Sequence, residues 1–416
     1  MALALRVGFA WAYVNEHPAR ALATIPFLFE PGNIAYSIAN GHGFGSPFRV
    51  DTGPTAWMTP VYPLLLAAIF RIFGTYTIQA FLAAVGMNIV FSTAACVPVF
   101  FAAKRIAGLG AATLAASLWA VFPTAILLTY ESLFDASLSA LLAATLLWAT
   151  LAVAESRRSR DWCLYGLLWG FALMTNAALI SLLPFLLGWA EYRAHLLGRF
   201  TFTKPALAAA MIVLCCLPWT IRNYRIFHAF VPLRSVGGLA LWLGNNDQAQ
   251  ALNPNHLHPI SDQDERERYV DMGEIAYMRE KQSLAVDYLL SHKAAEARLI
   301  AQRFTAIWTG GTIHPIADLL AAKTARFYLV VLFNLLGAAG AVAGIVIPWR
   351  TRSPFAFPLA AFPVVYPLVY YLALAPARYR LPIDPVLLLL TAIAFAHLPN
   401  YKVKNKRPAS ATAPQK

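Results

Sequence analysis

The chain has 416 residues, of which 59% are hydrophobic and 13% are charged, and its mean hydropathy is +0.56. Soluble domains carry about 25% charged residues, so this composition excludes a soluble globular fold. The formal net charge of +13 does not indicate a nucleic-acid partner, because the Lys and Arg residues lie mainly in short connectors between apolar windows.

The apolar windows are about 15 to 23 residues long, and about 20 such residues cross a hydrocarbon core of about 30 Å. They predict an all-α polytopic membrane protein with about ten transmembrane helices. Residues 1–14 are short for a span and are interpreted as a first helix, with a cleaved signal peptide as the alternative. We expect the other spans at 77–103, 108–129, 133–153, 161–175, 177–191, 204–222, 326–348, 354–375 and 383–398.

Five basic connectors orient these spans by the positive-inside rule. They are Lys104-Arg105, Arg157 to Arg160, Arg193 to Lys204, Arg350 to Arg352, and the tail from Lys402 to Arg407. Alternation of the spans places all five connectors on one side of the membrane, which we expect to be the cytoplasm.

Two segments then lie on the extracytoplasmic side. The first, residues 15–76, ends in an apolar stretch at 60–74 that is typical of an interfacial or re-entrant helix. The second, residues 223–325, is too long for a connector and predicts a small subdomain with helix-forming patches such as Glu265 to Tyr288. The remaining parts are an N-terminal transmembrane module (1–222, which includes the first loop), C-terminal transmembrane helices (326–398) and a disordered cytoplasmic tail (399–416).

The four cysteines, Cys96, Cys163, Cys215 and Cys216, lie inside predicted spans and form no C-x-x-C pair. This pattern indicates neither a disulfide framework nor a zinc site. We predict no metal-ligating residues and no certain cofactor, and we leave a divalent metal requirement open. The sequence contains no G-x-x-x-x-G-K-[ST] and no D-x-D motif.

Three acids near the outer ends of apolar windows are candidate catalytic residues, because ionisable groups are costly at membrane depth. Glu30 precedes Pro31, which can begin a short helix, so an N-cap role is the alternative. Glu131 and Asp135 are four residues apart and would share one face of a helix. A solvated interfacial turn is the alternative for that pair.

Basic and polar residues on the same side are candidate substrate-binding residues, since phosphate needs Arg forks or Lys charges. The outer pair of arginines in Pro376-Ala-Arg-Tyr-Arg-Leu-Pro382 runs against the positive-inside bias, with headgroup snorkelling as the alternative. Stacking by aromatic residues and hydroxyl recognition by a Gly-Asn-Asn-Asp turn are weaker hypotheses. The candidates are Arg378, Arg380, Arg222, Arg234, Tyr62 and Asn245.

Together these residues resemble the GT-C superfamily of polyprenol-phosphate-sugar glycosyltransferases. The resemblance lies in an acid of the first loop, the pattern Ile34-Ala-x-x-Ile-Ala-x-Gly-His-Gly-Phe44, and Pro60-x-Tyr-Pro63 leading to Ile72-Phe-Gly74. A second acid after the third span and Arg378-Tyr-Arg-x-Pro382 before the final span complete it. The nearest grouping is the bacterial proteins similar to glycosyltransferase family 39 and to dolichyl-phosphate-mannose-protein mannosyltransferase.

The resemblance implies inverting transfer of a sugar from a polyprenyl-phosphate donor to a protein, lipid or glycan acceptor outside the bacterial cytoplasmic (inner) membrane. It implies that Glu30, in place of the family's aspartate, is the general base and that Asp135, with Glu131 as its rival, is the second acid. The arginines, with Arg378 and Arg380 as the best match, would hold the lipid phosphate.

Two other functions remain as alternatives. A transporter or flippase of a lipid-linked sugar would use the same outer residues, although no internal repeat supports it. A non-catalytic member that binds lipid-linked sugar and scaffolds a cell-envelope complex is the second alternative.

Overall fold

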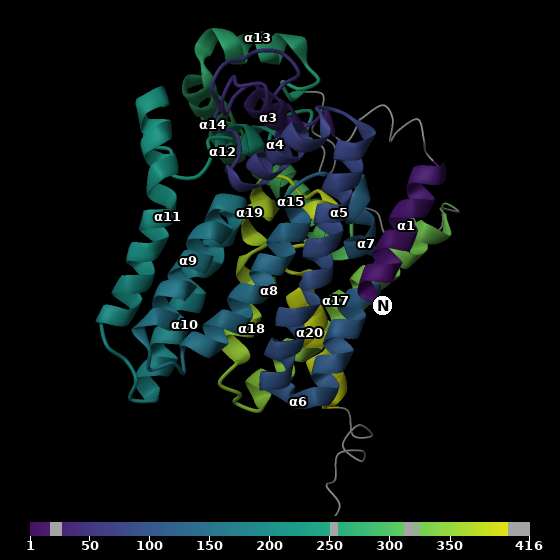
Figure 1. Ribbon diagram of the computed structural model, residues 1–416, viewed down its shortest axis with the longest axis vertical. Helices are drawn as coiled ribbons and strands as arrows, with labels where there is room; N and C mark the ends of the chain where they lie inside the picture. The colour runs from purple at the N-terminus through teal and green to yellow at the C-terminus, as the bar shows by residue number, and fades with distance from the viewer. Residues whose placement is uncertain (17–26, 250–256, 312–320, 322–323, 398–416) are drawn as a thin grey trace, which may run out of the picture.

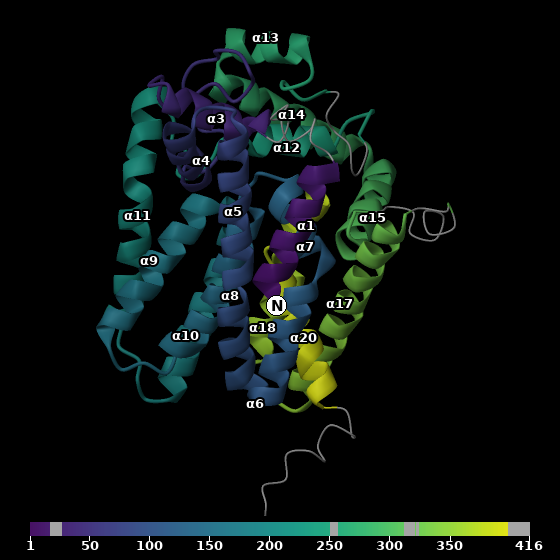
Figure 2. The same ribbon diagram turned by 45° about the vertical axis from the view of Figure 1, so that its right-hand side comes forward.

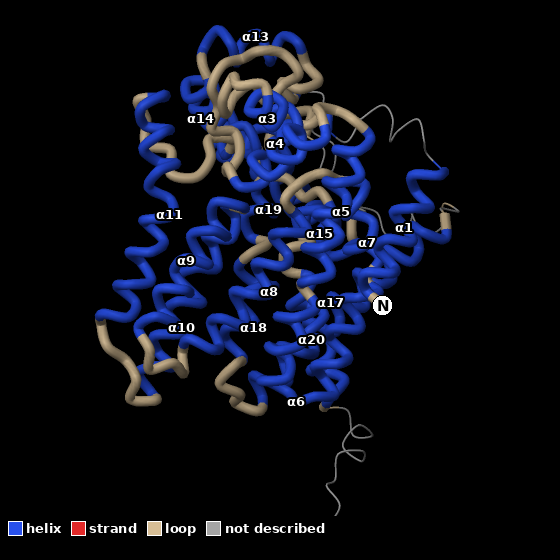
Figure 3. The backbone as a smooth tube through the Cα atoms, in the orientation of Figure 1, coloured by secondary structure: helices blue, strands red, loops and turns tan. Residues whose placement is uncertain are grey.

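The computed structural model describes residues 1–16, 27–249, 257–311, 321 and 324–397. These residues form helices joined by loops (Figure 3), and the pairing of extended backbone among them is limited to the isolated bridges Gly45–Pro54 and Phe48–Val50. The all-α fold class predicted from the sequence is confirmed.

Long apolar helices form the main body of the molecule (Figure 1). Four helical stretches of the described chain are long and apolar enough to cross a membrane, and the protein is polytopic as predicted. These stretches are α5 with α6 (Ile78–Ala94 and Cys96–Val121), α8 (Ala136–Val153), α11 (Thr203–Phe227) and α17 (Ala325–Arg350). The helices α9 (Ser159–Thr175), α10 (Leu183–Leu196), α18 (Ala356–Val365) and α20 (Asp384–Ala396) pack with them.

The structure corrects two predicted spans. The boundary expected between 103 and 108 lies at Gly108, where φ is 83° and α6 kinks, but the next helix does not reach residue 129. It ends at Val121, and Pro123 begins a separate helix, α7 (Pro123–Glu131), because the extended Phe122 interrupts the helical ladder. The span expected at 354–375 is divided into α18 and α19 (Leu368–Leu372), with Pro367 between them.

The connection between two other predicted spans is as expected. Asn176 has an extended conformation that ends α9, and its side chain accepts a hydrogen bond from the Ala178 amide at 3.0 Å. The chain then forms the 3₁₀ helix η2 (Ala177–Leu182) and continues into α10. Asparagine side chains favour such caps because they satisfy an unpaired amide of the next helix.

Glycines let the helices of the main body approach closely. Gly166 and Gly170 of α9, spaced as G-x-x-x-G, face α11, and a Cβ at Gly166 would overlap the Ala208 carbonyl. In α17, Gly340 and Gly344 face α20 in the same way. Helices in a bilayer associate through such small-residue contacts because lipid provides no hydrophobic driving force between them.

The first helix, α1 (Ala2–Glu16), is short as predicted and carries a fully buried arginine. The guanidinium of Arg6 donates to Ser92 Oγ at 2.8 Å and to the carbonyl oxygens of Ala120 at 3.0 Å and Trp119 at 3.2 Å. Because a buried charge needs such partners, Arg6 fixes α1 against α5 and α6.

Short helices cover one end of the main body, and we call them the cap (Figures 1 and 2). Helix α3 begins at Glu30 with Pro31 in its first turn, as predicted, and α4 occupies the expected apolar stretch. Helices α13 and α14 are separated at Gly273, where φ is 74°. The predicted helix-forming patch from Glu265 to Tyr288 is therefore helical, in two helices that are divided at Gly273. The cap comprises α3 (Glu30–Ala39), α4 (Val61–Phe73), α12 (Gly237–Gly244), α13 (Gln263–Met272) and α14 (Glu274–Ser291), and α15 (Lys293–Thr309) leads from it toward α17.

The two predicted outer segments pack into one hydrophobic core within the cap. Phe48 and Trp57 of the first segment contact Tyr269 and Leu243 of the second. The ring centroids of Phe48 and Tyr269 lie 5.1 Å apart in an edge arrangement. Segments about 200 residues apart therefore build one layer. The predicted tail, 399–416, lies outside the described residues.

Candidate active site

A cavity of about 630 Å³ lies between the cap and the ends of α8, α9 and α19. Its lining brings together two acids, two arginines and a histidine, namely Glu30, Asp135, Arg234, Arg378 and His258. Four of these five were singled out by the sequence, and they come from four separate parts of the chain. We call this space the cap cavity.

Glu30 is the first residue of α3, where the positive end of the helix dipole favours a carboxylate. Its side chain is 11% exposed, and Oε1 lies 3.3 Å from Nε2 of His258. Gly32 is required next to it, because a Cβ at that position would overlap the backbone of Phe27. The tight turn from Phe27 into α3 thus holds the carboxylate at the cavity wall.

His258 was not singled out by the sequence. Its imidazole meets the rings of Trp57 and Phe48 in edge arrangements, with centroids 5.4 Å and 6.1 Å away. Burial lowers the pKa of His258, while the Glu30 carboxylate acts in the opposite direction and the Arg378 guanidinium lowers it further. A histidine in a polar loop has no spacing signal, so the sequence alone could not connect it with Glu30.

Asp135 immediately precedes α8 and accepts a hydrogen bond from Ser139 Oγ at 2.7 Å. Asn176 Nδ2 donates to the same Ser139 hydroxyl at 3.1 Å, which ties the ends of α8 and α9 together. Glu131 does not share a helix face with Asp135, because α7 ends at Glu131 and Ser132 is extended. The i, i+4 relationship expected for these acids is therefore wrong.

Arg234 and Arg378 line the cavity without an ion-pair partner among the residues that the structure describes. The Arg378 guanidinium lies over the rings of Phe134 and Tyr379, at 4.2 Å and 5.2 Å from their centroids. Arg234 precedes the first turn of α12 in the chain. Gly237 and Gly238, at the start of that helix, also line the cavity. Free guanidinium groups and helix-start amides are suited to bind an anion.

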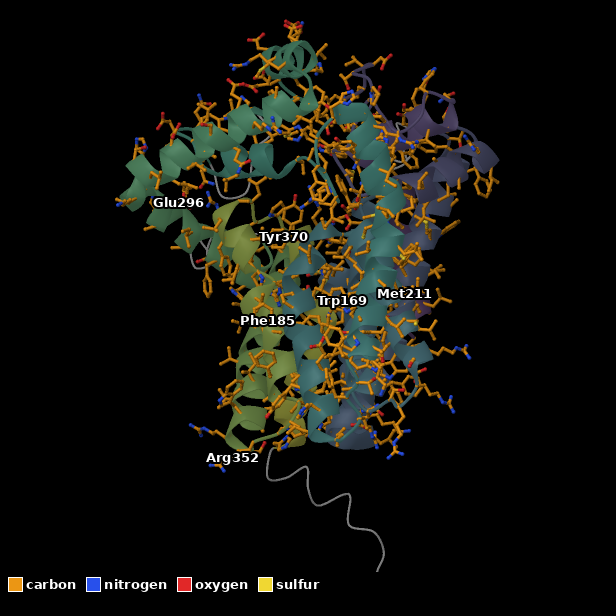
Figure 4. All side chains as sticks on the ribbon, turned by 90° about the vertical axis from the view of Figure 1, so that its left-hand side faces the viewer. Trp169, Phe185, Met211, Glu296, Arg352 and Tyr370 are labelled. Carbon is orange, nitrogen blue, oxygen red and sulfur yellow. The ribbon has the colours of Figure 1, made fainter. Side chains whose placement is uncertain are left out.

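Aromatic and apolar side chains form the rest of the wall. Tyr370 and Tyr379 are stacked with ring centroids 4.8 Å apart, and Figure 4 shows Tyr370 beneath the cap. Leu241, Leu372 and Leu374 add an apolar side to the same space. The cavity therefore combines charged groups with a surface that can accept a lipid chain or a sugar ring.

The structure gives Arg380 a different environment from Arg378. Arg380 is 3% exposed, and its guanidinium pairs with Asp384 at 2.7 Å and donates to the backbone oxygens of Trp308 at 2.9 Å and Asn334 at 3.2 Å. It does not line the cap cavity. The expected role of Arg380 in holding phosphate is corrected to a buried structural ion pair, because Nε, Nη1 and Nη2 of its guanidinium all donate to protein oxygens.

Arg222 also has a structural environment. It donates to the carbonyl oxygens of Thr55 at 2.6 Å and Phe44 at 2.7 Å, and its guanidinium lies 5.0 Å from the centroid of the Trp219 ring. Arg222 therefore fastens the first cap segment to the end of α11 rather than lining the cavity.

Three further candidates lie outside the cavity lining. Glu131 forms an ion pair with Arg326, and Tyr62 is buried and donates to Asn88 Oδ1 at 3.1 Å. Asn245 is buried, donates to the Leu372 carbonyl at 2.7 Å and accepts from Arg303. The polar groups of these side chains are engaged by protein, so the structure gives them supporting contacts instead of the expected contact with substrate.

Glu274 does not line the cap cavity but stabilises residues that form its wall. The buried carboxylate accepts hydrogen bonds from Thr55 Oγ1, from the Ala56 amide at 2.8 Å, from Ser235 Oγ at 2.6 Å and from the Tyr269 hydroxyl at 2.6 Å. It thus fixes the segment that ends in Trp57 and the residue next to Arg234. The sequence placed Glu274 only in a polar helical patch and gave no reason to single it out.

Within the described ranges, no group of three or more His, Cys, Asp or Glu side chains could hold a metal ion. The cavity chemistry visible on this chain is that of two carboxylates, one imidazole and two guanidinium groups.

The fold is similar to that of known structures. The chain has 16% sequence identity and a TM-score of 0.52 to the oligosaccharyltransferase AglB from Archaeoglobus fulgidus, in complex with an inhibitory peptide and a dolichol-phosphate. For a second structure of the Archaeoglobus fulgidus oligosaccharyltransferase, in complex with Zn and sulfate, the sequence identity is 15% and the TM-score is 0.50. Both matches cover 89% of this chain but only 46% and 44% of the enzymes, so the chain spans less than half of their length. The chain therefore shares its fold with these two structures over most of its own length.

Part of the sequence also matches a known protein family. Residues 57–221 match the family of dolichyl-phosphate-mannose-protein mannosyltransferases, which agrees with the predicted resemblance. The structure of ArnT from Cupriavidus metallidurans bound to undecaprenyl phosphate is also similar, with 14% identity, a TM-score of 0.36 and coverage of 93% of this chain and 78% of ArnT. No curated protein matches the sequence.

Proposed function

We propose that the protein is a membrane glycosyltransferase that moves a sugar from a polyprenyl-phosphate donor to an acceptor. The observation that carries the proposal is the joint presence of Glu30, Asp135, Arg234 and Arg378 in one cavity with an apolar side. The family pattern at 57–221 and the GT-C fold support it. The structurally similar oligosaccharyltransferase in complex with a dolichol-phosphate suggests the class of donor.

The donor phosphate would lie between Arg234 and Arg378. Both guanidinium groups face the cavity without an ion pair in the described structure, and the buried Nε of Arg378 has no hydrogen-bond partner there. A buried donor without a partner is unfavourable, and a phosphate oxygen would satisfy it. The first turn of α12 would add helix-dipole stabilisation to the same anion.

Glu30 would act as the general base. Its carboxylate takes the proton from an acceptor hydroxyl, and the acceptor oxygen forms a bond to the anomeric carbon on the face opposite the phosphate. The bond between that carbon and the phosphate oxygen breaks, and its electron pair leaves with the lipid phosphate. The arginines then stabilise the added negative charge, and the anomeric configuration is inverted.

Asp135 would support the reaction from the other wall. Ser139 occupies Oδ2, and the described residues provide no hydrogen-bond partner for Oδ1. A carboxylate oxygen with this freedom can accept a hydrogen bond from a sugar hydroxyl. We assign Asp135 to donor or acceptor orientation and Glu30 to proton transfer.

The reaction would take place on the extracytoplasmic face of the bacterial cytoplasmic membrane. The cap lies at one end of the molecule, and the loops after α10 and α17 lie at the other, where Figure 4 labels Arg352 (Figures 1 and 4). Basic loops favour the cytoplasmic side, which supports the cap on the opposite side.

The test is transfer by the purified protein from polyprenyl-phosphate sugars to a panel of protein, lipid and glycan acceptors. We expect Glu30→Gln to lower kcat by about 100-fold or more, because general-base catalysis contributes about 10² to 10⁴. Asp51→Asn is the matched control, since Asp51 is an exposed acid of the same loop outside the cavity lining.

Undiminished transfer by Glu30→Gln would contradict the role of that residue. Uptake of a lipid-linked sugar into proteoliposomes without chemical conversion would instead favour a transporter. Binding of the donor without turnover over the whole acceptor panel would favour a scaffold.

A further inference from the structure

The contact between Glu30 and a histidine from a distant segment defines a residue that acts on the base. We propose that His258 is a positioning residue that holds one oxygen of Glu30 and leaves the other to accept the acceptor's proton. Nε2 of His258 lies 3.3 Å from Glu30 Oε1, and both side chains are nearly buried at 12% and 11% exposed. This inference rests on the proposed function, because it assigns His258 through the base of that reaction.

The backbone fixes the tautomer of His258. The amide of Ile260 donates to Nδ1 at 3.1 Å, so Nδ1 is the acceptor of the ring. A neutral imidazole with Nδ1 unprotonated carries its proton on Nε2, which is the nitrogen that faces Glu30. The Nε2–H of His258 therefore lies on the side of Glu30, with Oε1 3.3 Å from Nε2.

The same geometry separates the roles of the two side chains. Both ring nitrogens of His258 face protein groups, because Nδ1 accepts from the Ile260 amide and Nε2 lies 3.3 Å from Glu30 Oε1. Glu30 keeps Oε2, which has no hydrogen-bond partner among the described residues. Proton transfer thus belongs to Oε2, and His258 sets the direction in which that oxygen points.

The surroundings disfavour protonation of His258 and enclose its ring. The rings of Trp57 and Phe48 enclose the imidazole, and the charged groups that act on it are Glu30 and Arg378. As the pH falls, protonation of His258 would place a proton on Nδ1 against the Ile260 amide and a cation beside Glu30. A cation at that distance stabilises the carboxylate and makes Glu30 a weaker base.

The experiment measures kcat and KM from pH 5 to 8 for the wild-type protein and for His258→Ala and His258→Gln. We expect His258→Ala to lower kcat by about 10- to 100-fold with a smaller effect on KM, the scale of misplacing a catalytic group by about 1 Å. His258→Gln keeps a nitrogen donor near the position of Nε2, so its kcat at pH 8 stays within about 5-fold of wild type.

The pH profile separates positioning from a general structural effect. On the acid side the wild-type profile includes the loss caused by protonation of His258, below the ordinary histidine pKa of about 6.5. His258→Gln cannot be protonated, so this component disappears and the acid limb becomes shallower. His42→Ala, an exposed histidine of the first cap segment, is the matched control and keeps the wild-type profile.

A double-mutant cycle with Glu30→Gln completes the test. If His258 acts through Glu30, then His258→Ala lowers kcat no further, within about 2-fold, once Glu30 is replaced. A full additional loss in that background, or a wild-type kcat for His258→Ala alone, would overturn the assignment and leave the proposed function standing. Absence of transfer by the wild-type protein from every donor would overturn the proposed function itself.

Discussion

Arg378 and Arg380 are two residues apart, but Arg378 lines the cap cavity and Arg380 forms a buried ion pair. The short 3₁₀ helix η4 (Ala377–Tyr379) turns the chain between them, so one guanidinium faces the cap cavity and the other enters the main body. The sequence pattern Arg-Tyr-Arg identified both as unusual but could not distinguish them, since the difference depends on a turn of three residues.

We expect Arg378→Gln and Arg380→Gln to differ in what they damage. Arg378→Gln removes a charged hydrogen bond to the donor phosphate, worth about 1.5 to 3 kcal/mol, and lowers kcat/KM by about 10- to 100-fold. Arg380→Gln leaves the buried Asp384 carboxylate unpaired and lowers the free energy of unfolding by about 3 to 5 kcal/mol. Steady-state kinetics and unfolding in detergent measure the two effects.

The opposite pattern would contradict this division. A stable Arg380→Gln protein with impaired donor binding would return Arg380 to the substrate, as the sequence first suggested. Asp384→Asn is the companion variant, because it breaks the same pair from the other side and is expected to destabilise the protein without changing donor affinity.

The candidate site was predictable at the residues whose type is unusual for their surroundings. Glu30, Asp135, Arg234 and Arg378 stand out as charged groups beside apolar windows, and all four line the cavity. His258 did not stand out, because its role depends on contact with a residue 228 positions away. The interactions of such residues arise from chain packing, which periodicity and composition do not encode.

At the scale of helices, close contact between α9 and α11 depends on the two glycines of α9. Gly166 faces the Ala208 backbone, and Gly170 faces the Cys215 side chain, so α11 can lie directly against α9. The rest of the α11 surface has little contact with protein, since only 17% of its apolar window is buried. The helix is therefore held on one narrow face, and its remaining surface is available to lipid.

We expect Gly166→Ala to lower the free energy of unfolding by about 1 to 3 kcal/mol, because the new methyl group meets a backbone oxygen that cannot move aside. Gly86→Ala in α5 is the matched control, because no atom lies within 4 Å of the Cβ it would add. Thermal unfolding of the detergent-solubilised variants measures both. Equal stability of the two variants would mean that α11 is not held by close packing at Gly166.

Helix existence was easier to predict than helix ends. The long apolar windows gave the main helices, and Asn176 ended α9 where expected. The errors came at Phe122, Ser132 and Pro367, where one to a few residues leave the helical conformation inside an apolar stretch. Hydropathy does not register such interruptions, because the interrupting segments are apolar or short.

At the scale of the whole molecule, the cap and the basic loops lie at opposite ends. We expect a cysteine at Gln263 in α13 to react with a membrane-impermeant maleimide in intact spheroplasts, and one at Arg158 to react only after permeabilisation. Both positions are exposed, so access depends on the side of the membrane. The background lacks the four native cysteines.

Labelling of both positions from the same side would contradict the predicted orientation. A reversed pattern would place the cap in the cytoplasm and exclude a reaction on the extracytoplasmic face. Either result would leave the fold unchanged, because the two ends are defined by the structure and only their compartments are predicted.

The hydrogen bonds to Glu274 also constrain how the protein matures. Thr55, one of the groups that donate to this carboxylate, leaves the ribosome 219 residues before its acceptor, an interval of roughly 10 to 40 s at about 5 to 20 residues per second. During that time the segment from Thr55 to Trp57 is synthesised but has no acceptor to close against. The wall of the cavity is therefore completed late in biogenesis, after most of the membrane helices have been made.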